Sequence, residues 1–206
     1  MKAGWFLGVD PTRGERGLAY LAGAFGVAAS VGIGMDAGWS WWRLGIVAVL
    51  AYDLAGGVVA NGLDSAKRFY HGPLPLRPTR VNRFLHDEIG FAAVHVQPIV
   101  VGLVFGAAWW WGPLWYAWAL AGTVLVARAP RPLARPIALL TVLTGAMLAP
   151  SIPAPDGLAW LPVVLLVKLV VAHAVPERPH SGTDRPEGRD GPDGVGGRWQ
   201  TPVHGT

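Results

Sequence analysis

The 206-residue chain has no cysteine and few charged residues, which make up 15% of it. Without cysteine, the chain cannot form disulfides, thiolate metal sites or a cysteine nucleophile. A soluble domain carries roughly 25% charged residues, whereas 52% of this chain is hydrophobic. The composition therefore argues against an ordinary soluble domain and favours a membrane protein.

Long apolar runs account for most of the hydrophobic residues. The six runs cover residues 17–33, 44–63, 89–108, 112–127, 132–149 and 157–175. Each approaches the ~20 residues that a helix needs to cross the hydrocarbon core. Prolines between the fourth and fifth runs break any continuous helix there. The sequence predicts an all-α fold: a bundle of six transmembrane helices within residues 17–175.

The basic residues are distributed unevenly between the connections. Fourteen Lys and Arg residues fall on one predicted side of the membrane, and only Arg43 falls on the other. Positive connections stay in the cytoplasm, so both termini are predicted to be cytoplasmic. Residues 1–16 form a cytoplasmic lead-in, and residues 176–206, rich in Pro, Gly and charge, form a disordered cytoplasmic tail.

The net charge of +4 belongs to these connections, where it would meet anionic lipid headgroups rather than nucleic acid. The abundance of Ala, Gly, Arg, Pro and Val resembles GC-rich bacterial coding. We therefore expect a multi-pass protein of the bacterial inner membrane.

Tryptophans cluster near the predicted outer interface. Eight of the eleven are Trp39, Trp41, Trp42, Trp109, Trp110, Trp111, Trp115 and Trp160. Amphipathic rings favour the headgroup level, so these side chains are predicted to be membrane anchors rather than a ligand cage.

Three ionisable residues lie within predicted spans: Asp53, His95 and Lys168. Such residues are costly in a bilayer and mark functional sites by default. On a regular helix, Asp53, Gly57, Ala60 and Asp64 lie within about 40° of one another, with Asn61 on the flank. We expect this face of the second span to pack against a face of the third span that contains Glu88, Ala92, His95, Gly102 and Gly106.

Together with the connection between these spans, the polar residues predict a pocket in the cytoplasmic half of the bundle. Its candidate residues are Asp53, Asn61, Asp64, Tyr70, His71, Glu88, His95 and Lys168. The pair Gly102 and Gly106 forms a GxxxG motif that suits an internal contact or a homo-oligomer.

Several functions fit this pocket. A proton-coupled carrier would use Asp53 and His95 as titrating groups and Lys168 as counter-charge. A metal site would draw on His71, His86 and His95, although no spacing places two of them on one helical face. A lipid-modifying enzyme would hold a phosphate with the basic connection and use His71 or His95 for acid–base catalysis.

A structural alternative also stands, in which Asp53 and Lys168 neutralise each other and His95 bonds the backbone. The protein would then be a non-catalytic membrane scaffold or assembly partner. The sequence slightly favours small-molecule or proton-coupled binding or transport, and it leaves the ligand, any cofactor and any enzymatic activity open.

Two resemblances bear on function. The segment Asp53–Asn61 resembles the D-x-x-D-G-x-x-A-R opening of CDP-alcohol phosphotransferases, but Gly56 replaces the second aspartate and the downstream aspartates are missing, so that activity is rejected. The pattern Asp53-x-x-Gly-Gly-x-x-x-Asn61, then Tyr70-His71, then His95-x-x-Pro98 resembles a group of uncharacterised bacterial multi-pass membrane proteins. That resemblance implies no activity and suggests only that these residues form one unit.

Overall fold

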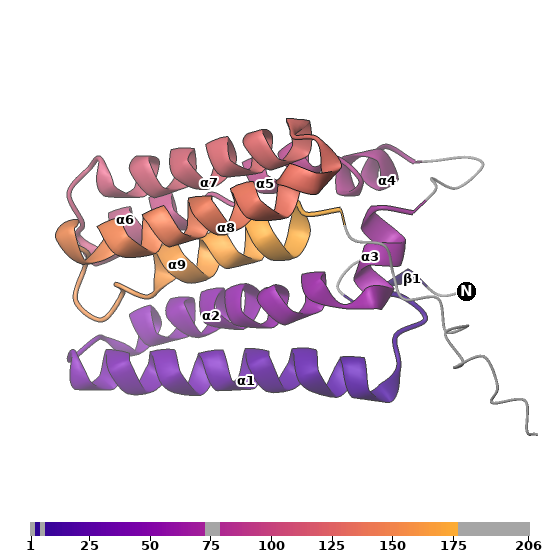
Figure 1. The fold of residues 1–206 in the computed structure, drawn as a ribbon. Coiled ribbons are helices and arrows are strands. Elements are labelled where there is room, and N and C mark those ends of the chain that lie inside the picture. Colours follow the sequence, from indigo (N-terminus) through magenta and orange to yellow (C-terminus); the bar gives the residue numbers. More distant parts are fainter. Residues whose placement is uncertain (1–2, 5–6, 73–78, 177–206) are drawn as a thin grey trace, which may run out of the picture.

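The computed structural model describes residues 3–4, 7–72 and 79–176, so the tail predicted to be disordered lies almost wholly outside the described part. The described chain is mainly a bundle of long helices that lie side by side along one direction (Figure 1). These are α1 (Arg13–Asp36), α2 (Trp41–Gly62), α3 (Asp64–Tyr70), α4 (Arg80–Leu85), α5 (Glu88–Ala93), α6 (Gln97–Phe105), α7 (Trp111–Arg128), α8 (Arg131–Leu148), η1 (Ala149–Ser151), α9 (Leu161–Leu166) and η2 (Val167–His173). Two short strands, β1 (Ala3–Gly4) and β2 (Gly8–Val9), pair antiparallel before α1.

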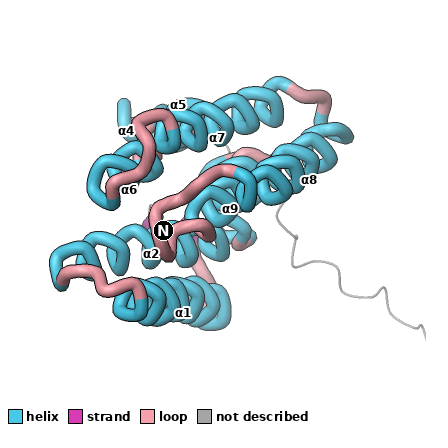
Figure 2. Tube along the Cα trace, turned by 90° about the vertical axis from the view of Figure 1, so that its left-hand side faces the viewer, coloured by secondary structure: helices cyan, strands magenta, loops and turns pink. Residues whose placement is uncertain are grey.

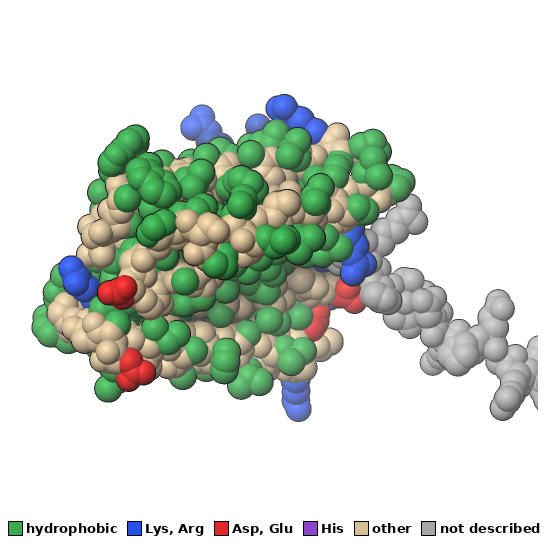
Figure 3. Space-filling model, turned by 60° about the vertical axis from the view of Figure 1, so that its left-hand side comes forward, with side chains coloured by type: hydrophobic (Ala, Val, Ile, Leu, Met, Phe, Trp, Pro, Cys, Tyr) green, Lys and Arg blue, Asp and Glu red, His purple; other side chains and the backbone are tan. Residues whose placement is uncertain are grey.

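Four of these helical segments are long and apolar enough to cross a membrane. They are α1, α2, the consecutive helices of Glu88–Phe105, and Arg131–Ser151. The other two apolar runs form α7, whose Trp, Tyr and Pro residues reduce its hydropathy, and the shorter Leu161–His173 helix. Apolar side chains cover much of the outer surface (Figure 3), with Phe25 71% and Leu103 79% exposed. An exterior this apolar suits lipid rather than water.

The run at residues 89–108 is not one regular helix. Residues 94–96 separate α5 from α6, and Pro98 stands in the first turn of α6. Proline has no N–H for an intrahelical bond and is tolerated where a helix begins. The single face predicted for Glu88, His95 and Gly102 is therefore interrupted.

The packing of α2 also differs from the prediction. This helix packs chiefly against α1 and η2 and touches α6 only locally. Figure 2 shows α1 and α2 side by side, with α6 and α7 on the other side of the bundle. Glycines permit the close α1–α2 approach, since a Cβ added to Gly26 would lie 2.6 Å from the Ala55 Cβ.

The GxxxG pair serves contacts within the chain. A Cβ added to Gly102 would meet Trp111 and Gly112 of α7, and Gly106 ends α6 with φ of 74°. Only glycine adopts that backbone conformation without strain. The homo-oligomer remains a prediction, and these two glycines have internal roles.

The two ends of the bundle differ in charge. The starts of α1 and α8 and the ends of α2, α7 and η2 lie at one end, together with α3 and α4 (Figure 1). We call this the basic end, because it carries Arg13, Arg16, Arg68, Arg80, Arg83, Arg128 and Arg131. The opposite end consists of the connections at residues 37–40, 106–110 and 152–160, and Arg43 lies there.

Tryptophans gather at the opposite end, but two of the predicted anchors belong to the core. Trp41 and Trp109 are 84% and 85% exposed, as anchors should be, whereas Trp111 and Trp115 are buried at 0% and 1%. Both buried rings lie on α7, which packs against α6, α8 and η2. The sequence predicts both as interfacial anchors, but they lie on the face of α7 that packs into the bundle.

Candidate functional site

An ion pair joins α2 to η2 inside the bundle. Lys168 Nζ donates to Asp53 Oδ2 at 2.7 Å, and Gln97 Nε2 of α6 donates to the same oxygen at 3.1 Å. The lysine side chain is 3% exposed, whereas the aspartate side chain is 39% exposed. Burying the lysine is tolerable because its charge is paired. The structure thus brings together two of the predicted residues and adds Gln97.

A glycine lets the lysine reach the carboxylate. Gly57 lies one turn after Asp53 on α2, and a Cβ added there would lie 2.5 Å from Lys168 Cε and 3.1 Å from its Nζ. The lysine chain therefore lies directly across the backbone of α2. Gly57 of the predicted small-residue face thus packs against a lysine of the last helix rather than against the third span. Asp64 is not on this face, because α2 ends at Gly62 and Asp64 begins α3.

The π-helical geometry of η2 sets the direction of two polar side chains. The bond from Ala174 N to Leu169 O, 3.0 Å, spans five residues instead of the usual four. On a regular α-helix, residues five apart diverge by about 140°. The wider turn instead lets Lys168 and His173 both face the interior, where they are 2% and 1% exposed. Segments of π-helix are often found at functional sites.

His95 lies in the break between α5 and α6. Its Nδ1 is 2.6 Å from the Phe91 carbonyl oxygen, and its ring centroid is 4.6 Å from that of Phe91. Lys168 and Asp53 are close enough to act on it electrostatically. The backbone bond matches the structural alternative drawn from the sequence, and the position places His95 beside the ion pair.

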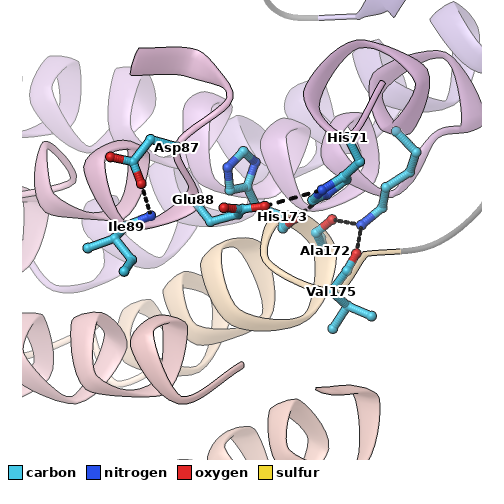
Figure 4. Close-up of polar contacts among 8 residues, drawn as sticks. His71, Asp87, Glu88, Ile89, Ala172, His173 and Val175 are labelled. Atoms are coloured by element: carbon cyan, nitrogen blue, oxygen red, sulfur yellow. Dashed lines mark hydrogen bonds and ion pairs between the residues drawn. The ribbon is translucent and has the colours of Figure 1, made fainter. Parts of the chain in front are cut away.

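A second polar group ties α3 to the C-terminus of η2. Lys67 Nζ donates to the Ala172 and Val175 carbonyl oxygens at 2.6 and 2.7 Å. His71 Nε2 lies 3.0 Å from the His173 carbonyl oxygen, and Figure 4 shows the two residues beside Glu88. The last carbonyls of a helix have no intrahelical partner and carry partial negative charge. We call Lys67, His71 and Glu88 the C-terminal clasp.

His71 also contacts a carboxylate from α5. Its other nitrogen, Nδ1, lies 3.4 Å from Glu88 Oε1. The two ring nitrogens of His71 thus face the C-terminus of η2 on one side and Glu88 on the other.

Aromatic rings enclose His173 beneath the clasp. Its ring stacks on Phe91 at 3.8 Å and meets the Tyr70 ring edge-on at 4.7 Å. Both ring nitrogens are buried and make no hydrogen bond within the described part of the chain. Burial raises the pKa of Tyr70 from its usual 10.0 to about 12.

The remaining predicted residues lie outside these groups. Asn61 is buried near the end of α2 without a hydrogen-bond partner for its Nδ2 among the described residues, and Asp64 begins α3. His86 packs on the Phe69 ring at 5.4 Å. Across the described residues, no three His, Asp or Glu side chains converge as a metal site requires, so the structure does not bring the candidates His71, His86 and His95 together.

Three residues at these sites are not among the eight candidate pocket residues predicted from the sequence: Gln97, Lys67 and His173. Gln97 carried a usable signal, since it is a polar residue within an apolar run two positions after His95. Lys67 resembled any other cation in a basic connection, and only the structure shows that it is 2% exposed. The inward position of the His173 side chain depends on the π-helical turn, which no sequence pattern predicts.

Comparisons with known proteins do not identify a ligand or a reaction for this site. No protein-family model, no curated protein and no solved structure matches this chain.

Proposed function

We propose that this chain is a multi-pass protein of the bacterial inner membrane that binds, and in doing so transports, a proton or a small cation at Asp53. In this proposal the six apolar runs all span the bilayer, and the basic end with both termini faces the cytoplasm. The excess of arginine at that end supports this orientation, because positive connections are retained on the cytoplasmic side.

One observation carries the functional part: the Asp53 carboxylate is incompletely satisfied. Its two hydrogen bonds with described residues both end on Oδ2, and 39% of the side chain remains exposed. Beside it, Gln97 Oε1 is buried and makes no hydrogen bond within the described residues. Asp53 Oδ1 and Gln97 Oε1, two acceptors without a donor in the described part of the chain, favour a ligand that donates hydrogen bonds, such as hydronium or a small ammonium ion.

Lys168 supplies the coupling in this proposal. A cation that binds Asp53 competes with the lysine for the same carboxylate, and a buried lysine without its partner favours releasing a proton. Binding at Asp53 would thereby be linked to proton movement. His95 is close enough to the pair for Lys168 and Asp53 to act on it electrostatically, which makes it our candidate to receive that proton.

The test uses the purified protein in lipid nanodiscs with methylammonium as probe, followed by tryptophan-fluorescence melting. Ligand at one hundred times Kd stabilises a protein by about 2.7 kcal/mol, so the wild type should melt at higher temperature. The double variant Asp53→Asn/Lys168→Gln removes both charges together and leaves no unpaired ion. It should fold but show no shift.

Asp36→Asn is the matched control, because this carboxylate is exposed at the opposite end of the bundle. It should respond like the wild type. Proton flux into pyranine-loaded vesicles, driven by a potassium gradient with valinomycin, supplies the second readout. If the double variant matches the wild type in both readouts, the ion pair is structural and the scaffold alternative replaces this proposal.

A further inference from the structure

A cavity of about 160 Å³ opens at the opposite end of the bundle, far from the ion pair. It is lined by Ala37, Trp39, Arg43, Phe105, Pro155 and Asp156. Its volume is roughly ten times the ~10–15 Å³ that a single water needs. The cavity therefore has room for a small organic ligand.

Two aromatic rings hold the Arg43 side chain in place, and no described residue accepts a hydrogen bond from its buried Nε. Its Cζ lies 5.2 Å from the Trp42 ring centroid and 5.7 Å from the Phe105 ring centroid. Its Nε is buried and makes no hydrogen bond to any described residue. Cation–π contacts orient the charge but do not use its N–H donors. A buried donor without an acceptor is unfavourable, and an incoming acceptor would remove that penalty.

Asp156 lines the same cavity but forms no ion pair with Arg43 among the described residues. The two opposite charges thus face one cavity while remaining more than 4.0 Å apart. A ligand with one anionic and one cationic group would bridge them. A simple anion would meet the carboxylate, and a simple cation would meet the guanidinium.

The walls of the cavity are set by close packing. Trp39 lies against Gly34, where an added Cβ would collide with its ring, and close to Gly157, where an added Cβ would lie 3.2 Å from the ring. Its ring centroid is 4.7 Å from that of Phe105. Gly157 has φ of 76°, which suits glycine. These contacts connect three segments around the cavity and keep it open before any ligand arrives.

We propose that this cavity binds a small zwitterion whose oxyanion pairs with Arg43 and whose ammonium pairs with Asp156. The planar guanidinium fork suits a phosphate or carboxylate, and the carboxylate accepts from an ammonium. Two sources offer this chemistry: the headgroup of phosphatidylethanolamine and a free amino acid. The site is separate from Asp53 and does not depend on the function proposed there.

Native mass spectrometry of the purified full-length protein tests the lipid source, with dioleoyl phosphatidylethanolamine or dioleoyl phosphatidylglycerol added in equal amounts. Melting in the presence of alanine tests the soluble source. At least one zwitterion should bind, either as ethanolamine lipid retained several-fold more than glycerol lipid or as a rise in melting temperature with alanine. Whichever response appears identifies the source.

Asp156→Asn should abolish the preference for the zwitterion, and Arg43→Gln should reduce binding at least fivefold. Asp156 is exposed, so its variant should fold even if Arg43→Gln does not. Asp36→Asn, an exposed carboxylate outside the cavity, serves as control and should bind like the wild type. The proposal is overturned if neither zwitterion is preferred, or if Asp156→Asn behaves as the wild type.

Discussion

Gly57 shows how a single residue decides the position of a buried charge. The lysine chain crosses α2 at this glycine to reach Asp53, with no room for a Cβ. In a helix interior, glycine is less favourable than alanine by about 0.5–1 kcal/mol. The glycine at this position is thus explained by the lysine that lies across it.

Gly57→Ala should destabilise the protein by about 1–3 kcal/mol, as overpacking does. The new methyl would displace Lys168 from Asp53, and the drop in tryptophan-fluorescence melting temperature measures the cost. Gly45→Ala is the matched control on the same helix, because a Cβ there meets nothing within 4 Å. That variant should be neutral or slightly stabilised. Equal melting temperatures for the two variants would show that the lysine does not need the glycine.

Some residue-scale features were readable from the sequence. Asp53 and Lys168 were identified as costly ionisable residues within apolar runs, and their mutual neutralisation was one of the alternatives. The sequence did not show which helix packs against Asp53. It predicts the third span as the partner, whereas the structure has Lys168 of η2 as the main partner and Gln97 of α6 as a second one. Helix-face arguments find which side chains share a face but not which helix covers it.

At the scale of elements, the last helix is held at its C-terminus by α3. The side chains of Lys67 and His71 contact three carbonyl oxygens at the C-terminus of η2, those of Ala172, His173 and Val175. On the other side of α3, Glu15 Oε1 of α1 accepts from Ser65 N at 3.0 Å, and Arg68 donates to the Val9 carbonyl oxygen at 3.1 Å. The short helix therefore joins the beginning and the end of the described chain.

Lys67→Met should cost about 3 kcal/mol, since it leaves buried carbonyls without donors and hydrogen bonds to charged groups are worth about 1.5–3 kcal/mol each. Hydrogen–deuterium exchange should accelerate in η2 and α3 ahead of the other helices. Arg135→Met, an exposed cation of α8, is the control and should leave exchange unchanged. Uniformly faster exchange along the whole chain would argue against a local clasp.

Element boundaries illustrate the limits of sequence reasoning in physical terms. All six apolar runs contain helix, as predicted. The length of an apolar run is a strong signal for a helix. The break at residues 94–96 has a local signal in Pro98, which starts α6. The π-helical turn of η2 and the burial of Trp111 and Trp115 depend on tertiary packing and have no signature in local composition.

For the whole molecule, charge asymmetry is the main guide to orientation. Arginines of several separate connections meet at the basic end, whereas Arg43 lies at the opposite end beside the exposed tryptophans. Four helical segments are long and apolar enough to cross a membrane. The two proposed ligand sites lie at different places in this arrangement, with Asp53 inside the bundle and the Arg43 cavity at the end opposite to the basic end.

Labelling of single cysteines in intact bacterial cells tests this frame most directly, and the cysteine-free chain is its own background. The positions are Ser40 and Ser151 at the opposite end and Gly14 and Pro130 at the basic end, each exposed and uncharged. A membrane-impermeant maleimide should label Ser40→Cys and Ser151→Cys in intact cells, and Gly14→Cys and Pro130→Cys only after permeabilisation. Labelling of Gly14→Cys or Pro130→Cys in intact cells would contradict the proposed six-span orientation.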